Sequence, residues 1–137
     1  MDGAIRDVKE LLASMEPVLN DGVYGFATLS SDSTLPLPHM VAMVREPEGV
    51  SVVAETSLLA QHGIPSRFQA AWITLKVHSD LAAVGLTAAF AAALGEAGIS
   101  CNVVAGHCHD HIFVPHEQAA AAMRCLKALQ QQAAEAV

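Results

Sequence analysis

The hydrophobic positions of this chain repeat with two periods, and the alternation of the two predicts its secondary structure. Apolar residues three or four positions apart, such as Leu86, Phe90 and Leu94, are typical of a helix that packs one face on a sheet. Alternating apolar and polar residues, as in 71–78, are typical of a strand with one exposed face. The pattern predicts helices at 4–14, 56–62, 80–97 and 116–132, strands at 23–29, 40–45, 50–55 and 71–78, and a strand, a tight turn and a second strand within 98–115.

The order of these elements is α-β-β-β-α followed by β-α-β-β-α. This order predicts an α+β fold in which helices cover one face of an antiparallel sheet. The two halves look like versions of one β-α-β-β-α theme, so the pattern suggests an internal repeat, although few residues match between them. Residues 20–22 are predicted to form a turn, and the proline-containing segment 30–39 a loop.

Composition narrows the functional classes. A chain of 137 residues holds one compact domain or two small domains that share a core. With 53% hydrophobic and 15% charged residues, part of the apolar surface is expected to be covered by a partner subunit, which favours a homodimer. The net charge of -7 and the absence of a basic run argue against nucleic-acid binding and against docking on anionic membranes.

Targeting and redox signals favour a cytoplasmic protein. The longest weakly polar run, 81–94, is shorter than the roughly 20 residues that span a bilayer. The first residues contain no apolar segment of a secretory signal. The three cysteines form neither an even set nor a C-x-x-C motif, which fits reduced thiols.

Several segments carry a resemblance to a known family. Residues 73–81, 84–87, 98–105 and 109–115 resemble the small bacterial ACT-domain proteins, which are tandem ACT modules of largely unassigned function, and residues 11–22 are similar to the opening of the same family. The resemblance implies a ferredoxin-like fold in two modules, an N-terminal ACT-like half at 1–63 and a C-terminal ACT domain at 64–137. It also implies a regulatory protein that binds a small molecule, usually an amino acid, with no catalytic activity and no cofactor.

In this family the ligand binds near the turn between the first strand and the first helix of a module, which implies the turn 78–86 in this chain. Many members have a Pro-Gly pair there, whereas this chain has Val84 and Gly85. Independently of the family, the unpaired N–H groups at a helix N-terminus suit a ligand carboxylate, and Asp80 or the carbonyl of Val103 could accept an ammonium group. The alternative is that Asp80 only caps the helix. The candidate ligand-binding residues are His78, Ser79, Asp80, Val84, Gly85, Leu86, Asn102 and Val103.

The first half departs from the family pattern, because the loop 30–39 replaces the helix that would follow its first strand. This departure raises the alternative of an interaction subunit whose ligand site has decayed. Trp72 is expected to be a core or interface anchor rather than a stacking platform.

A histidine cluster supports a second hypothesis. His107, Cys108, His109 and His111 have the side-chain types that bind zinc. If the turn lies at 108–110, His107 and His111 face each other across the hairpin. The alternative function is therefore a metal-binding protein or an enzyme that uses this cluster. Because no further ligand pair stands at a familiar spacing, we expect polar turn residues, with neither a metal nor a catalytic residue.

Overall fold

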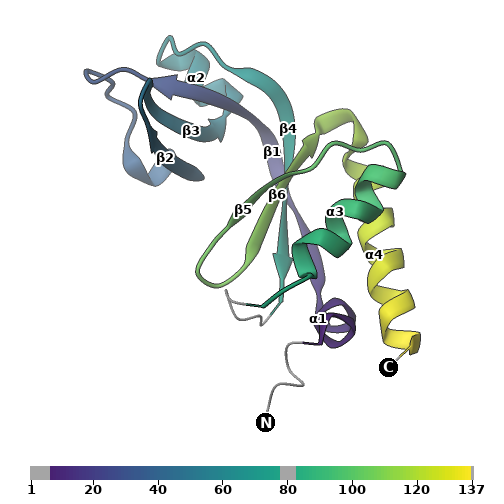
Figure 1. Cartoon of the computed structure of the whole chain (residues 1–137). Helices are drawn as coiled ribbons and strands as arrows, with labels where there is room; N and C mark the ends of the chain where they lie inside the picture. Colours follow the sequence, from purple (N-terminus) through teal and green to yellow (C-terminus); the bar gives the residue numbers. More distant parts are fainter. Residues whose placement is uncertain (1–6, 78–82, 137) are drawn as a thin grey trace.

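The computed structural model describes residues 7–77 and 83–136. Their strands form one antiparallel sheet of six strands in the order β2-β3-β1-β4-β6-β5 (Figure 1). The strands are β1 (Glu16–Leu29), β2 (Ala42–Glu46), β3 (Gly49–Glu55), β4 (Arg67–Lys76), β5 (Asn102–Ala105) and β6 (Asp110–Pro115). The helices are α1 (Val8–Ser14), α2 (Thr56–Gln61), α3 (Leu86–Glu96) and α4 (Ala119–Ala136), with 3-10 turns η2 (Leu37–His39) and η3 (His116–Gln118).

The strand β1 is twice as long as predicted. The segment expected to be a turn, 20–22, lies inside this strand, where the pairing with β4 shifts between Asn20 and Tyr24. The turn prediction was therefore wrong, because residues that favour a tight turn also form a β-bulge when both flanking segments have a partner strand. The pairing partner, Trp72 for Asn20 and Ala70 for Tyr24, comes from far along the chain.

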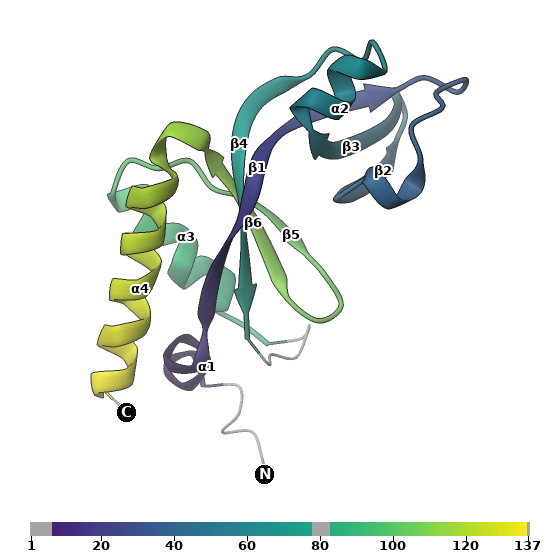
Figure 2. The same cartoon turned by 180° about the vertical axis from the view of Figure 1, so that it is seen from behind.

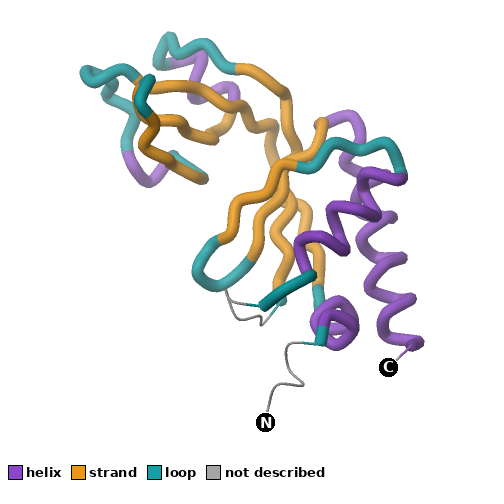
Figure 3. The backbone as a smooth tube through the Cα atoms, viewed as in Figure 1, coloured by secondary structure: helices purple, strands orange, loops and turns teal. Residues whose placement is uncertain are grey.

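The strands β1 and β4 belong to both halves of the sheet. Residues 16–20 of β1 pair with 72–76 of β4 beside the hairpin of β5 and β6, whereas residues 24–29 pair with β3. Figure 3 shows both strands passing from one group of strands into the other. The N-terminal unit thus contains the second part of β1, a loop with η2, then β2, β3, α2 and the start of β4. In the C-terminal unit, β4 pairs with β6 on one side and with the first part of β1 on the other. The first part of β1 thus stands where a module of its own would have a strand after α4.

Three groups of buried side chains hold the fold together. The largest lies between the sheet and the helices α1, α3 and α4, and it includes Leu11, Leu12, Phe90 and Leu126. Figure 2 shows these three helices grouped on one side of the strands. A second group lies between α2 and the N-terminal strands, around Leu59. The predicted antiparallel sheet with helices on one face is confirmed.

The third group contains most of the aromatic side chains. Five of the six aromatic residues of the chain meet on the sheet face away from the helices, and only Phe90 lies elsewhere. Tyr24 and Trp72 meet edge to face with ring centroids 5.3 Å apart, and Phe26 and Phe113 do so at 5.6 Å. We call this group, Tyr24, Phe26, Phe68, Trp72 and Phe113, the aromatic cluster. The expectation that Trp72 anchors a core agrees with its place there.

The division of the chain between residues 63 and 64 stays a prediction. The packing shows that one helix of the first half, α1, lies with the second half. Leu11 and Leu12 of α1 belong to the same buried group as Phe90 of α3 and Leu126 of α4. The side chain of Gln130 also donates a hydrogen bond of 2.7 Å to the carbonyl of Ala13. The N-terminal helix therefore packs with the C-terminal unit. Within 7–77 and 83–136, no helix combines the length and the apolar character needed to cross a membrane.

We predict that Leu11→Ala and Leu12→Ala each lower the free energy of unfolding by about 2–5 kcal/mol, because both leave a cavity in the largest core. Urea unfolding followed by circular dichroism measures the change. Leu37→Ala is the control, since that side chain is 65% exposed and its loss should change stability by no more than about 0.5 kcal/mol. Equal effects of Leu11→Ala and Leu37→Ala would show that α1 does not contribute to the C-terminal core.

Candidate functional site

Four polar side chains form a hydrogen-bonded network on the sheet face away from the helices. The amide of Asn20 donates to the hydroxyl of Thr74 at 3.0 Å and to the carbonyl of Trp72 at 3.2 Å. The indole N–H of Trp72 donates to Nδ1 of His111 at 3.1 Å, and the Thr74 hydroxyl lies 3.3 Å from the same nitrogen. The register pairs Asn20 of β1 with Trp72 and His111 of β6 with Thr74, so the four side chains are neighbours on one face of the sheet.

The network fixes the state of His111. Because Nδ1 accepts the indole hydrogen, the neutral ring carries its proton on Nε2. Burial lowers the pKa of His111, and His109 lowers it further, whereas Asp110 opposes the shift. Burial in turn raises the pKa of Asp110. His111 is therefore a neutral, oriented side chain and a poor candidate for a proton-loaded catalytic acid.

The hairpin turn lies earlier than predicted, which separates His107 from His111. The N–H of Gly106 donates to the carbonyl of His109 at 2.9 Å, so His107 and Cys108 form the turn. The sequence predicts that His111 faces His107 across the hairpin. In the structure, His111 pairs with Val104 instead. A glycine is needed at 106, because a Cβ atom there would lie 2.8 Å from the carbonyl oxygen of His109.

The geometry gives the metal hypothesis little support. Among residues 7–77 and 83–136, no three His, Cys, Asp or Glu side chains converge as they would around a metal ion. The three cysteines are free, and burial raises the pKa of Cys101 to about 11, which opposes formation of a reactive thiolate.

The predicted ligand turn is only partly described. His78, Ser79 and Asp80 lie outside the described residues. The helix expected at 80–97 begins at Leu86, and Gly85 occupies its N-cap position with φ +103° and no side-chain cap. The N-cap of this helix is therefore Gly85 and not Asp80, which corrects the expectation that Asp80 caps it. The side chain of Val84 is 85% exposed, whereas that of Leu86 belongs to the largest core and offers no contact to a ligand in solvent.

The register sets Asn102 and Val103 back from the end of β4, the strand that precedes this turn. Asn102 pairs with Phe113, which pairs with Trp72, four residues before β4 ends at Lys76. The side chain of Val103 packs against the largest core. The physical reason is the antiparallel register, which places the start of β5 level with the middle of β4 and its hairpin turn level with the end.

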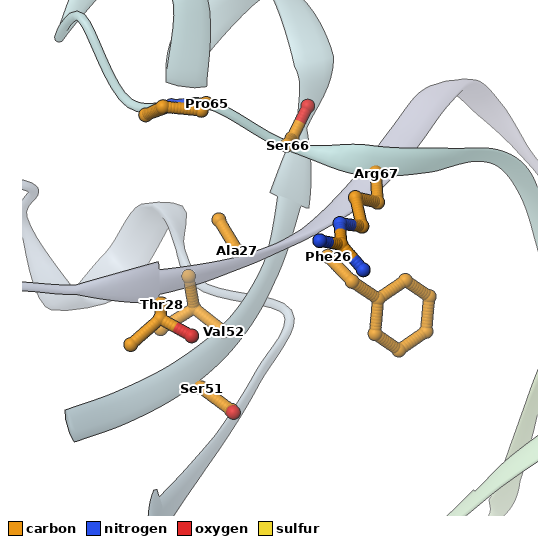
Figure 4. A pocket seen from close by; sticks show the side chains of 8 residues that line it. All are labelled: Phe26, Ala27, Thr28, Ser51, Val52, Pro65, Ser66 and Arg67. Atoms are coloured by element: carbon orange, nitrogen blue, oxygen red, sulfur yellow. The ribbon is translucent and has the colours of Figure 1, made fainter. Parts of the chain in front are cut away.

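A hollow of about 650 Å³ opens where β4 ceases to pair with β1. The last pair is Phe26 with Arg67, so the next residues of β1 have a strand partner only in β3. Figure 4 shows the side chains around this hollow, with the guanidinium of Arg67 reaching down beside β1. The lining residues are Phe26, Ala27, Thr28, Ser51, Val52, Pro65, Ser66 and Arg67.

The charge in this hollow, which we call the Arg67 hollow, favours an anion. Arg67 is its only charged lining residue, and the hydroxyl of Thr28 is a further donor, whereas the hydroxyl of Ser51 donates to the carboxylate of Glu46. A guanidinium binds a carboxylate through two parallel hydrogen bonds. Beyond Phe26 the open edge of β1 presents alternate N–H and C=O groups, to which an ammonium group can donate. Sequence reasoning missed this site; the one signal was a lone arginine at the start of an apolar strand.

Comparisons with known proteins agree with the tandem arrangement. Two family models match the chain, and both describe ACT domains, one over residues 3–71 and the other over residues 67–128. The two ranges meet at the start of β4, the strand shared by both units. Among curated proteins, none matches the chain.

Several solved structures are similar to the chain. A Vibrio cholerae protein of unknown function, described as a possible transport protein, is 45% identical, covers 92% of this chain and 98% of its own, and superposes with a TM-score of 0.81. A protein from Agrobacterium tumefaciens is 20% identical, with coverage of 85% and 89% and a TM-score of 0.64. The ligand-free regulatory subunit of aspartate kinase from Thermus thermophilus is 10% identical, with coverage of 82% and 95% and a TM-score of 0.58. At 20% and 10% identity, the last two similarities show a shared fold and nothing more.

We predict that His111 makes stability depend on pH. Its pKa is lowered in the folded chain, so its contribution is complete above the ordinary value of about 6.5 and is lost as pH falls from there through the lowered pKa. The free energy of unfolding should therefore fall less steeply from pH 7 to pH 5 in His111→Asn, which keeps an acceptor near Nδ1, than in the unchanged chain. Urea unfolding across this range measures the slope, and His62→Asn, at an exposed position, should follow the unchanged chain. Equal slopes for the two variants would rule out this role.

Proposed function

This chain belongs to the ACT-domain family, as its sequence predicted, and on that premise we propose that it is a regulatory module that binds an amino acid and catalyses no reaction. ACT domains are regulatory domains that bind small molecules. The proposal includes a homodimer in the cytoplasm, a location that three unpaired cysteines favour.

The Arg67 hollow is the observation that carries the amino-acid ligand. Arg67 matches a carboxylate, and the neighbouring open edge of β1 matches an ammonium group. Because the chain carries a net charge of -7, a hollow with a lone guanidinium is a local exception that concentrates small anions.

The sequence-predicted turn remains a second candidate site for the same ligand. Gly85 precedes the first N–H groups of α3, and no protein side chain caps them within the described residues. The substitution Val84→Glu would place a carboxylate beside these groups, whereas Val84→Gln has nearly the same shape without the charge. The two sites can thus be distinguished by substitution.

We predict that at least one of the twenty amino acids raises the melting temperature at millimolar concentration, because a ligand of the folded state stabilises it by mass action. Arg67→Gln should weaken the binding of that amino acid at least tenfold in isothermal titration calorimetry, a loss of about 1.4 kcal/mol in binding free energy. Arg124→Gln removes the same charge from an exposed position on α4 and should leave affinity unchanged.

Three outcomes separate the sites. Loss of binding in Arg67→Gln alone supports the Arg67 hollow. Loss in Val84→Glu but not in Val84→Gln supports the turn before α3. If none of the twenty amino acids stabilises the chain, the proposed ligand is wrong, and the interaction subunit with a decayed site becomes the better hypothesis.

We predict that the chain is a dimer whose contact involves the edge strand β2. Met43 and Val44 are 50% and 55% exposed on this strand, which has a partner on one side only. Light scattering at micromolar concentration should give twice the mass of 14.3 kDa. Val44→Lys should shift the protein toward the monomer, whereas Leu19→Lys, at a side chain 43% exposed on β1, should not. A monomer at all concentrations would contradict the dimer.

A further inference from the structure

A second hollow, of about 330 Å³, lies where the two units meet on the sheet face away from α3 and α4. Three strands contribute to its lining, with Tyr24 from β1, Glu55 from the end of β3 and Trp72 from β4. The segment 38–41, which begins inside η2, and Leu58 of α2 complete the lining. Tyr24 and Glu55 are direct partners in the pairing of β1 with β3, so the register itself places the carboxylate beside the aromatic rings.

The aromatic side of this hollow is held in place. Tyr24 and Trp72 meet at 84°, with ring centroids 5.3 Å apart. The hydroxyl of Tyr24 donates to the carbonyl of Asp21 at 2.6 Å, and the indole N–H of Trp72 donates to His111 at 3.1 Å. Both polar atoms are thereby used within the chain. What the two rings offer to a ligand is their π surface, which attracts cations.

The charge of this hollow is opposite to that of the Arg67 hollow. Glu55 is its only acidic lining residue, and no lysine or arginine is among the lining residues. Burial raises the pKa of Tyr24, and the negative charges of Glu55 and Asp21 raise it further. The other titratable side chain in the lining is that of His39, which belongs to η2.

We propose that this hollow, bordered by Tyr24, Trp72 and Glu55, binds a small organic ammonium ion. The rings contact the apolar and cationic surface of the ion, and the exposed carboxylate of Glu55 balances its charge. The side chain of Met40 adds a soft apolar contact. The inference does not rest on the amino-acid function, because it uses another hollow and the opposite charge.

The only tryptophan of the chain borders this hollow, so its fluorescence reports on occupancy. The probe is choline, and the control ligand is 3,3-dimethylbutan-1-ol, which has nearly the same shape without the charge. Titration of the full chain at pH 8 and constant ionic strength avoids protonated imidazoles, which would compete as cations. We expect a saturable change with choline at millimolar concentration and at least tenfold weaker binding of the uncharged alcohol.

Glu55→Gln should weaken the binding of choline at least fivefold. Circular dichroism checks that the variant is folded. Glu48→Gln removes the same charge from the exposed turn at the other end of β3 and should leave the affinity unchanged. Arg67→Gln should also leave choline binding unchanged, which separates this test from that of the amino-acid site. Equal binding of choline and the alcohol, no saturable response to choline, or an unchanged affinity in Glu55→Gln would each overturn the proposal.

Discussion

The pairing of β1 with β4 is the interaction on which the rest of the fold depends. These two strands are the only ones that belong to both units, and each unit attaches its remaining elements to one end of the pair. Two irregularities interrupt the pairing, one between Asn20 and Tyr24 and one between Tyr24 and Phe26. The second coincides with Phe68, whose φ of +66° is rare for a residue with a side chain. Such bulges increase the local twist, and the two units diverge where they occur.

The polar network next to these bulges has a structural as well as a chemical consequence. Thr74 is the one buried polar or charged residue among the described residues, at 7% exposure. Its hydroxyl needs partners there, and Asn20 from β1 and His111 from β6 supply them. A slip of either strand by one residue would turn these side chains to the helix-covered core. The network therefore specifies the register of three strands, and hydrogen bonding specifies it more sharply than apolar contact alone.

Periodicity was enough to predict the fold class, because helices and half-buried strands each leave a local pattern. It could not predict the first part of β1, since Asn20, Asp21 and Gly22 favour a turn unless a distant strand pairs with them. The start of α3 was missed for a similar reason: Ser79 and Asp80 have the composition of a cap, but the helix begins only at Leu86, with Gly85 as its N-cap. Both hollows depend on where strands stop pairing, and only the three-dimensional register determines that.

The aromatic cluster connects the linings of the two hollows. Phe26 lines the Arg67 hollow, while Tyr24 and Trp72 line the hollow at Glu55. Phe113 joins them, since its ring lies 5.6 Å from that of Phe26 and 6.5 Å from that of Trp72. A ligand in either hollow thus contacts an aromatic side chain that is linked through Phe113 to the rings bordering the other hollow. Any effect of one ligand on the affinity of the second must be reciprocal, and its size is set by the difference in packing of this cluster between the two bound states.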